Sequence, residues 1–148
     1  MEWVTRLHGK LVGLDTAPFI YLIEDHPSYA PHLVALFEAA EQGRVRIVTS
    51  VVTLAEVLVR PLRERQADLV AEYRDILLGS LCVETLPVSA AIAERAAELR
   101  ATHGLRTPDA IQLATAMDAG AVAFLTNDTR LRMVAGLEVL ILTELRGA

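Results

Sequence analysis

Residues 10–24 read K-L-V-G-L-D-T-A-P-F-I-Y-L-I-E, and the apolar run at their start stops abruptly at Asp15. A short run closed by Asp15, Thr16 and Pro18 is typical of a buried strand that leads into a helix. In open α/β sheets ligands bind beyond the carboxyl ends of the strands, so an acid at the end of a central strand lies where chemistry usually occurs. The simpler interpretation is that Asp15 or Thr16 only caps the helix that follows.

The length and composition predict one domain over residues 1–148 that is not embedded in a membrane. The chain is 53% hydrophobic with a mean hydropathy of +0.36. Every long apolar stretch is nevertheless broken well short of the ~20 residues that a membrane-spanning helix needs. The first ten residues lack the basic start and apolar centre of a signal peptide, so we expect a cytoplasmic protein. Cys82 is the only cysteine, which excludes an internal disulfide and multi-cysteine metal sites.

The formal net charge of -5 argues against a protein that coats nucleic acid without specificity. Binding of that kind depends on a surplus of Lys and Arg facing phosphate. An enzyme that acts on nucleic acid is still compatible with this charge. An acidic pocket that holds divalent cations lowers the formal charge and binds a phosphodiester through those cations.

Predicted strands and helices alternate along the chain. Apolar and β-branched runs predict strands at residues 10–14, 45–49, 81–86, 121–126 and 137–142. Helical spacing predicts helices at residues 17–24, 31–41, 54–60, 62–78, 90–102 and 109–119, with Pro61 separating the third from the fourth. This alternation predicts an α/β fold of three layers, in which helices cover both faces of a mainly parallel sheet of about five strands.

Four acidic residues stand at the ends of these predicted elements. Asp15 ends the first strand, Glu56 lies in the helix after the second, and Asp128 follows the fourth, while Asp109 opens the helix before the fourth strand. Strand ends and helix starts of this kind share one edge of a parallel sheet, so the four carboxylates should lie close together. Each acid also has a structural explanation: Glu56 suits a capping box begun by Thr53, and Asp109 and Asp128 suit helix starts.

Four converging carboxylates would repel one another and raise each other's pKa values unless a cation neutralised them. Carboxylate oxygens and water are the ligands that Mg²⁺ and Mn²⁺ prefer. A metal held in this way serves phosphodiester hydrolysis, because it activates water and stabilises the leaving oxygen. The sequence therefore predicts a metal-dependent hydrolase that acts on a phosphate ester.

Four segments, taken together and in order, resemble the motifs of a known family. They are V-G-L-D-T-A-P-F-I-Y-L-I-E at 12–24, T-S-V-V-T-L-A-E-V-L-V-R-P at 49–61, L-R-T-P-D-A-I-Q-L-A-T-A at 105–116 and F-L-T-N-D-T-R-L at 124–131. The family is that of the PIN-domain ribonucleases, in particular the VapC-type toxins of prokaryotic toxin-antitoxin pairs. Each motif is short, but the resemblance runs over nearly the whole chain.

The resemblance implies an endoribonuclease dependent on Mg²⁺ or Mn²⁺, a homodimer, and inhibition by a small antitoxin protein. It assigns metal binding and catalysis to four acids: Asp15, Glu56, Asp109 and Asp128. It also suggests polar supports that orient a carboxylate or a water molecule: Thr16, Thr126 and Asn127. No motif acid is missing, so nothing indicates an inactive copy.

Three arginines lie near these acids in the sequence and are candidates for contacts with RNA phosphate: Arg60, Arg106 and Arg130. A solvated helix face or loop is the ordinary interpretation of each.

Two other functional classes remain open. One is a phosphohydrolase that forms an aspartyl phosphate, but its second acid would stand where Ala17 does, and Lys10 is the only lysine. The other is a non-catalytic module of the same fold that binds RNA or protein, since a fold alone does not determine function.

Overall fold

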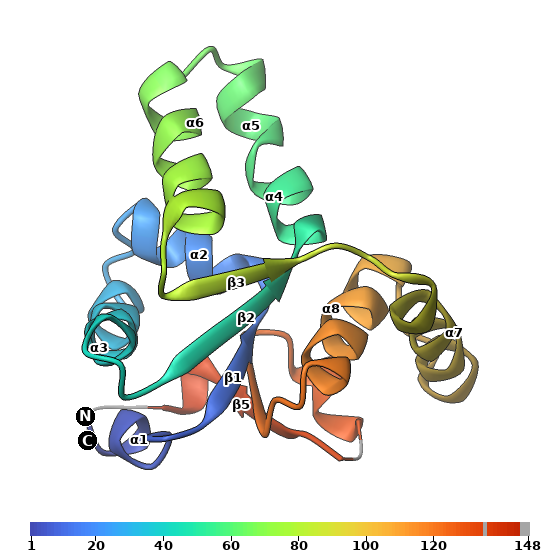
Figure 1. Cartoon of the computed structure of the whole chain (residues 1–148). Helices are drawn as coiled ribbons and strands as arrows, with labels where there is room; N and C mark the ends of the chain where they lie inside the picture. Colours follow the sequence, from blue (N-terminus) through green and yellow to red (C-terminus); the bar gives the residue numbers. More distant parts are fainter. Residues whose placement is uncertain (135, 146–148) are drawn as a thin grey trace.

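Five strands, all parallel, form one sheet with β1 at its centre (Figure 1). The computed structural model describes residues 1–134 and 136–145. The strand order is β3-β2-β1-β4-β5, and the strands are β1 (Leu11–Leu14), β2 (Arg46–Ser50), β3 (Val83–Leu86), β4 (Ala123–Thr126) and β5 (Glu138–Ile141). The predicted α/β class and the predicted parallel, five-stranded sheet are confirmed.

The strand order reverses at β1, which creates a natural binding position. From β1 the chain adds β2 and β3 on one side, and it returns to place β4 and β5 on the other. The backbone N–H of Asp15, just past β1, donates a hydrogen bond of 3.0 Å to the carbonyl of Leu125 in β4. In sheets of this topology the crevice between the carboxyl ends of two such strands receives the ligand. Here those ends are Asp15 and residues 127–128.

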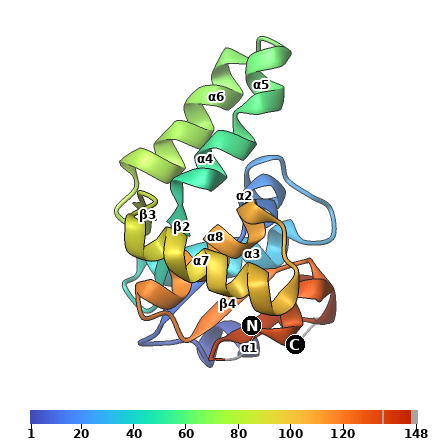
Figure 2. The same ribbon diagram turned by 90° about the vertical axis from the view of Figure 1, so that its right-hand side faces the viewer.

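Helices cover both faces of the sheet (Figure 2). One face packs against α1 (Glu2–Thr5), α2 (Thr16–Ile23) and α3 (Ala30–Glu41). The other packs against α7 (Ala90–His103) and α8 (Thr107–Asp118). All four residues of β1 are buried, because a central parallel strand has a helix layer on each side. Helix α1 was not predicted from the sequence.

Three helices and a π-helical turn form an arm that projects from the sheet (Figures 1 and 2). They are α4 (Val51–Val57), α5 (Val59–Arg63), α6 (Ala67–Arg74) and η1 (Asp75–Gly79). The predicted single helix over 62–78 is wrong, because the chain reverses at Arg65, whose φ is 56°. Pro61 lies inside α5 and does not separate two helices. Apolar spacing continues across the reversal, so periodicity alone did not reveal it.

Two short 3₁₀ segments flank β5, namely η2 (Thr129–Met133) and η3 (Leu142–Glu144). Within residues 1–134 and 136–145, every helix is too short or too polar to cross a lipid bilayer.

Helix α8 packs on β1 so closely that the strand requires glycine at position 13. A Cβ atom built on Gly13 would lie 2.6 Å from the Cβ of Ala116 and 2.9 Å from Cδ1 of Phe124. Both neighbours are fully or almost fully buried. Neither can move aside without disturbing the helix or the adjacent strand.

Replacement of Gly13 by alanine tests this contact. We expect Gly13→Ala to lower the free energy of unfolding by about 1–3 kcal/mol, the usual cost of overpacking a core. Gly79→Ala is the matched control, because an added Cβ there meets no atom within 4 Å, and its stability should stay within about 0.5 kcal/mol of the wild type or rise. Urea denaturation measures both. Equal stability of the two variants would contradict the prediction.

Candidate active site

A cavity of about 440 Å³ opens at the carboxyl ends of β1 and β4. Its lining comes from the N-cap and body of α2, the end of β4 and the segment that follows β4. The lining residues are Asp15, Ala17, Tyr21, Thr126, Asn127, Asp128, Thr129 and Arg130. The cavity therefore occupies the crevice at which the strand order reverses.

Asp15 is held on both of its carboxylate oxygens. Oδ1 accepts a hydrogen bond of 2.9 Å from the backbone N–H of Thr16, and Oδ2 accepts one of 2.7 Å from the hydroxyl of Thr126. The Thr126 hydroxyl in turn accepts a hydrogen bond of 3.0 Å from the backbone N–H of Asp128. Asp15 is thus the N-cap of α2 and also lines the cavity. The two interpretations of this acid are compatible.

The surroundings of Asp15 disfavour its negative charge. Burial raises the pKa of the Asp15 carboxyl above its ordinary value, and the hydrogen bonds from Thr126 and Thr16 offset only part of this. The nearby carboxylates of Asp109 and Glu56 raise the pKa of Asp15 further. A half-buried acid with a raised pKa and two acidic neighbours is a typical feature of a functional site.

Two of the predicted arginines lie at this site and pair with its acids. Both Asp128 oxygens accept hydrogen bonds from Arg130, the shortest being 2.6 Å from Nη2 to Oδ2. Nε of Arg106 donates a hydrogen bond of 3.2 Å to Oδ2 of Asp109. The residue Asp109 is only 8% exposed. The hydrogen bonds from Arg130 lower the pKa of Asp128, and the acids raise the pKa values of both arginines.

The structure does not bring Arg60 to the cavity. Arg60, in the arm, pairs with the carboxylate of Glu24 at the end of α2. The hydroxyl of Tyr73 in α6 donates a bond of 2.5 Å to the other oxygen of Glu24. Burial and this acid raise the pKa of Tyr73. The cluster ties the base of the arm to α2, so a structural role suits Arg60 better than RNA binding.

Glu56 lies on the solvent-exposed side of the site and is held by Thr16. Its Oε1 accepts a hydrogen bond of 2.6 Å from the Thr16 hydroxyl. The capping-box interpretation of Glu56 is wrong, because α4 begins at Val51 and its cap is Ser50. The hydroxyl of Thr53, the expected cap, is fully buried and bonded elsewhere.

Behind Glu56 lies a buried polar network that was not predicted from the sequence. Its centre is Gln112 of α8, which is 2% exposed. The Gln112 Nε2 atom donates to the hydroxyl of Thr53 at 2.5 Å and to that of Thr16 at 3.2 Å. The hydroxyl of Thr49 lies 2.8 Å from that of Thr53 and donates to the carbonyl of Leu14 at 2.9 Å.

The donor and acceptor roles in the network are determined, because an amide N–H can only donate. Thr16 accepts from Gln112 and so directs its own proton to Glu56. Thr53 likewise accepts from Gln112 and directs its proton to Thr49. A signal in the sequence could have revealed Gln112: it is a polar residue in an apolar helix segment, one turn after Asp109.

Asn127 does not support a carboxylate as predicted. Its Oδ1 accepts hydrogen bonds from the backbone N–H of Thr143 at 3.1 Å and from the Thr143 hydroxyl at 2.6 Å. Its Nδ2 lies 3.5 Å from the hydroxyl of Tyr21. Thr16 and Thr126, by contrast, do hold the carboxylates of Glu56 and Asp15.

The donor set suits a hard divalent cation, although the acids are not gathered around one point. Within the part of the chain that the structure describes, no three His, Cys, Asp or Glu side chains are grouped closely enough to hold a metal ion. Asp109 and Asp128 are engaged by Arg106 and Arg130. The insufficiently compensated carboxylate of Asp15 is nevertheless the kind of oxygen ligand that Mg²⁺ and Mn²⁺ bind.

Comparison with known proteins identifies a matching protein family and structures of similar fold. A family model described as the PIN domain matches residues 12–137, and no curated protein sequence matches the chain. VapBC2 from Rickettsia felis, solved with a promoter DNA fragment, is 20% identical with a TM-score of 0.69, covering 88% of this chain and 98% of that chain.

Two structures from Mycobacterium tuberculosis are also similar to this chain. VapC20, described as a toxin that cleaves the sarcin-ricin loop, is 19% identical with a TM-score of 0.69, over 87% of this chain and 98% of that chain. VapBC-5 is 27% identical with a TM-score of 0.55, over 88% and 98%. The fold is therefore that of the VapC proteins, and because the family model spans most of the sequence, the chain belongs to the PIN-domain family.

Proposed function

We propose that this protein is an endoribonuclease dependent on Mg²⁺ or Mn²⁺ and the toxin of a VapBC-type toxin-antitoxin pair. The observation that carries the proposal is the half-buried Asp15 carboxylate at the crevice where the strand order reverses, with Asp109 and Glu56 close enough to raise its pKa. In this proposal the protein acts in the cytoplasm as a homodimer. A small antitoxin protein inhibits it, as the VapBC complexes among the similar structures suggest.

The proposed metal ligands are the four acids Asp15, Glu56, Asp109 and Asp128. When bound, a divalent cation supplies an activated water and neutralises charge on the departing oxygen. Thr126 and the N–H of Thr16 orient Asp15. The Thr16 hydroxyl, fixed by Gln112, orients Glu56.

Arg106 and Arg130 have a second use in this proposal. Both side chains are 66% exposed, and both already touch the acids. A guanidinium group binds phosphate in the same forked geometry that it uses for a carboxylate. Once a cation binds the acids, each arginine is free to turn toward the RNA backbone.

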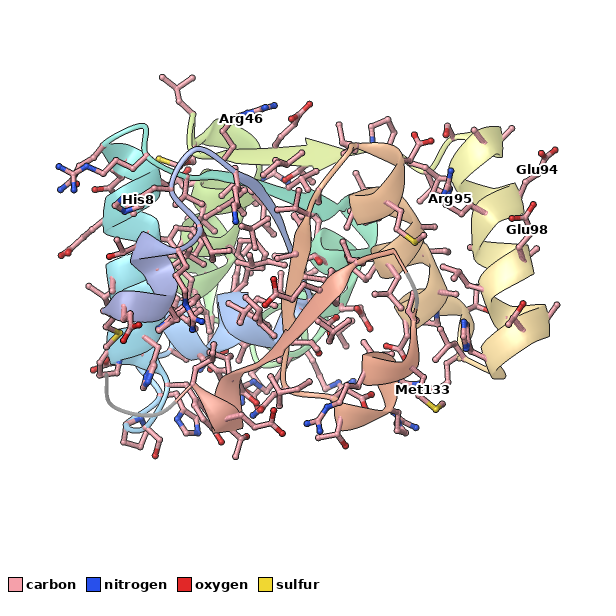
Figure 3. The ribbon with its side chains drawn as sticks, turned by 90° about the horizontal axis from the view of Figure 1, so that it is seen from below. His8, Arg46, Glu94, Arg95, Glu98 and Met133 are labelled. Carbon is pink, nitrogen blue, oxygen red and sulfur yellow. The ribbon has the colours of Figure 1, made fainter. Side chains whose placement is uncertain are left out.

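RNA cleavage by the purified, antitoxin-free protein tests the proposed function. The wild type with Mg²⁺ or Mn²⁺ should cut a mixed pool of structured RNA at defined sites. Asp15→Asn should reduce the cleavage rate at least about 100-fold, since it removes the charge of the central ligand, and EDTA should abolish cleavage. Glu98→Gln is the matched control, because Glu98 is an acid on α7 that points away from the body (Figure 3).

The outcomes of this assay separate the competing functions. Cleavage that Asp15→Asn does not reduce would mean a contaminating nuclease or a different site. If no preparation cuts RNA, the non-catalytic module becomes the better explanation. Growth arrest on induction of the wild type, but not of Asp15→Asn, would distinguish a toxin from an RNA-processing enzyme.

The raised pKa of Asp15 predicts a specific dependence of stability on pH. A carboxyl whose pKa is higher in the folded than in the unfolded chain gives stability that is complete below the unfolded pKa and is lost as pH rises through the folded pKa. Asp15→Asn should therefore be more stable than the metal-free wild type at neutral pH, on the order of 1 kcal/mol.

Urea denaturation between roughly pH 4 and pH 7 measures this effect. The difference in unfolding free energy between Asp15→Asn and the wild type should widen as pH rises. Added Mg²⁺ should narrow it, because the cation stabilises only the protein that binds it. A difference that stays constant with pH would show that Asp15 titrates normally.

Gln112 should affect metal binding without touching the metal. Gln112→Leu keeps a similar volume but removes both donors, so Thr16 no longer has to direct its proton to Glu56. We expect the affinity for Mn²⁺ to fall about 10-fold, as for other residues that orient a ligand, measured by calorimetry without RNA. Thr16→Val should have the same effect, and the double variant should not add to it. Unchanged affinity would mean that Glu56 does not hold the metal.

A further inference from the structure

One side of the cavity has no part in the metal chemistry. Asp15, Thr126 and Asp128 form its acidic side, where the cation and the phosphate would bind. Tyr21 and Asn127 also line it, yet neither makes a hydrogen bond to a motif acid. An aromatic ring suits a flat ligand group that stacks on it, and an amide suits polar atoms at the edge of that group.

The ring of Tyr21 is fixed in place by two other rings. Its centroid lies 4.9 Å from that of Tyr29, at an interplanar angle of 35°, and 4.8 Å from that of His26, at 60°. His26 and Tyr29 stack on each other at 4.6 Å and 26°. A ring held in this way loses little conformational freedom when a ligand packs against it.

The amide of Asn127 is fixed in orientation as well. Its Oδ1 accepts two hydrogen bonds from Thr143, which leaves Nδ2 as the donor directed at the Tyr21 side of the cavity. Among the described residues the only acceptor of Nδ2 is the Tyr21 hydroxyl, at the limiting distance of 3.5 Å. A second N–H of this amide therefore remains available to a ligand acceptor.

We propose that Tyr21 and Asn127 form a nucleobase subsite next to the scissile phosphate. The base of one nucleotide stacks on Tyr21 and accepts a hydrogen bond from Nδ2 of Asn127 through a carbonyl or ring nitrogen. A base within a duplex is already stacked and paired, so the subsite selects an unpaired nucleotide. The proposal rests on the proposed function, since it takes RNA as the substrate.

A double-mutant cycle, in which the Tyr21 ring and one RNA base are removed singly and together and the binding affinity is measured, tests the subsite. The protein background is Asp15→Asn, which is expected not to cleave, and the ligands are a fluorescent single-stranded RNA and a set of versions that each lack one base. Tyr21→Leu should weaken binding of the intact RNA about 10-fold, the usual worth of one stacked base. Tyr21→Phe keeps the ring face and should restore most of this affinity.

The decisive result is a single RNA position at which the effects on affinity of removing the base and of removing the Tyr21 ring are not additive. RNA without that base should bind the Tyr21 protein about 10-fold more weakly, and Tyr21→Leu should then cause no further loss. Removal of a base elsewhere should leave the effect of Tyr21→Leu intact. If Tyr21→Leu weakens every RNA equally, or none, the subsite does not exist.

A second variant keeps the proposal testable if Tyr21→Leu fails to fold. Asn127→Leu has a similar shape but no donor, and in an otherwise wild-type protein it should reduce the preference among bases at the cleavage site. An unchanged preference would overturn the role of Asn127. Failure of the subsite and failure of the proposed function are distinguishable. Cleavage without coupling removes only the subsite, whereas coupling without cleavage retains the subsite on a non-catalytic RNA-binding protein.

Discussion

The site depends on the close contact between α8 and β1 at Gly13. Because Ala116 rests on a residue without a side chain, the helix axis comes nearer to the strand than any larger residue would permit. Gln112 and Asp109 lie about one and two turns before Ala116 on the same face of the helix, since residues three or four apart share a face. The contact thus fixes three things in register: Ala116 over the middle of β1, Gln112 beside its end, and Asp109 near Asp15. A shift of α8 would loosen the network and the acidic site together.

The carboxylates of the acidic site destabilise the folded state, and the surrounding hydrogen bonds reduce this destabilisation. Asp15 is half-buried beside other carboxylates, yet both of its oxygens are hydrogen-bonded. The network around Gln112 leaves no hydroxyl among its threonines without a partner, as a buried polar cluster requires. The remaining unfavourable free energy therefore comes from the negative charges of the acids. A bound cation would remove this contribution. Such local destabilisation is a common feature of sites that bind metals.

The strands and the position of Asp15 could be predicted because they depend on local pattern: a buried strand shows as an apolar run, and its end shows as polar turn residues. The places of Asp109 and Asp128 at element ends could be predicted in the same way, whereas their role as metal ligands stays a prediction. The Gln112 network could not be predicted, because its partners lie 59 and 96 residues away along the chain. The same reason applies to Arg60, whose partner Glu24 is 36 residues distant. The reversal at Arg65 escaped detection because it needs a left-handed residue, which no glycine marks.

Under the proposed function, the balance of charge at the site would reconcile an acidic protein with an RNA substrate. The four motif acids carry four negative charges when all are ionised, and Arg106 and Arg130 supply two positive charges, which leaves an excess of two negative charges. A phosphodiester is also anionic, so this excess repels RNA as long as the acids lack a cation. In the proposed function, one divalent cation would cancel the excess and would also release the arginines from Asp109 and Asp128. The cation would then control RNA binding as well as the chemical step. The electrostatic attraction for RNA would arise at the site itself, without a surplus of basic residues over the surface.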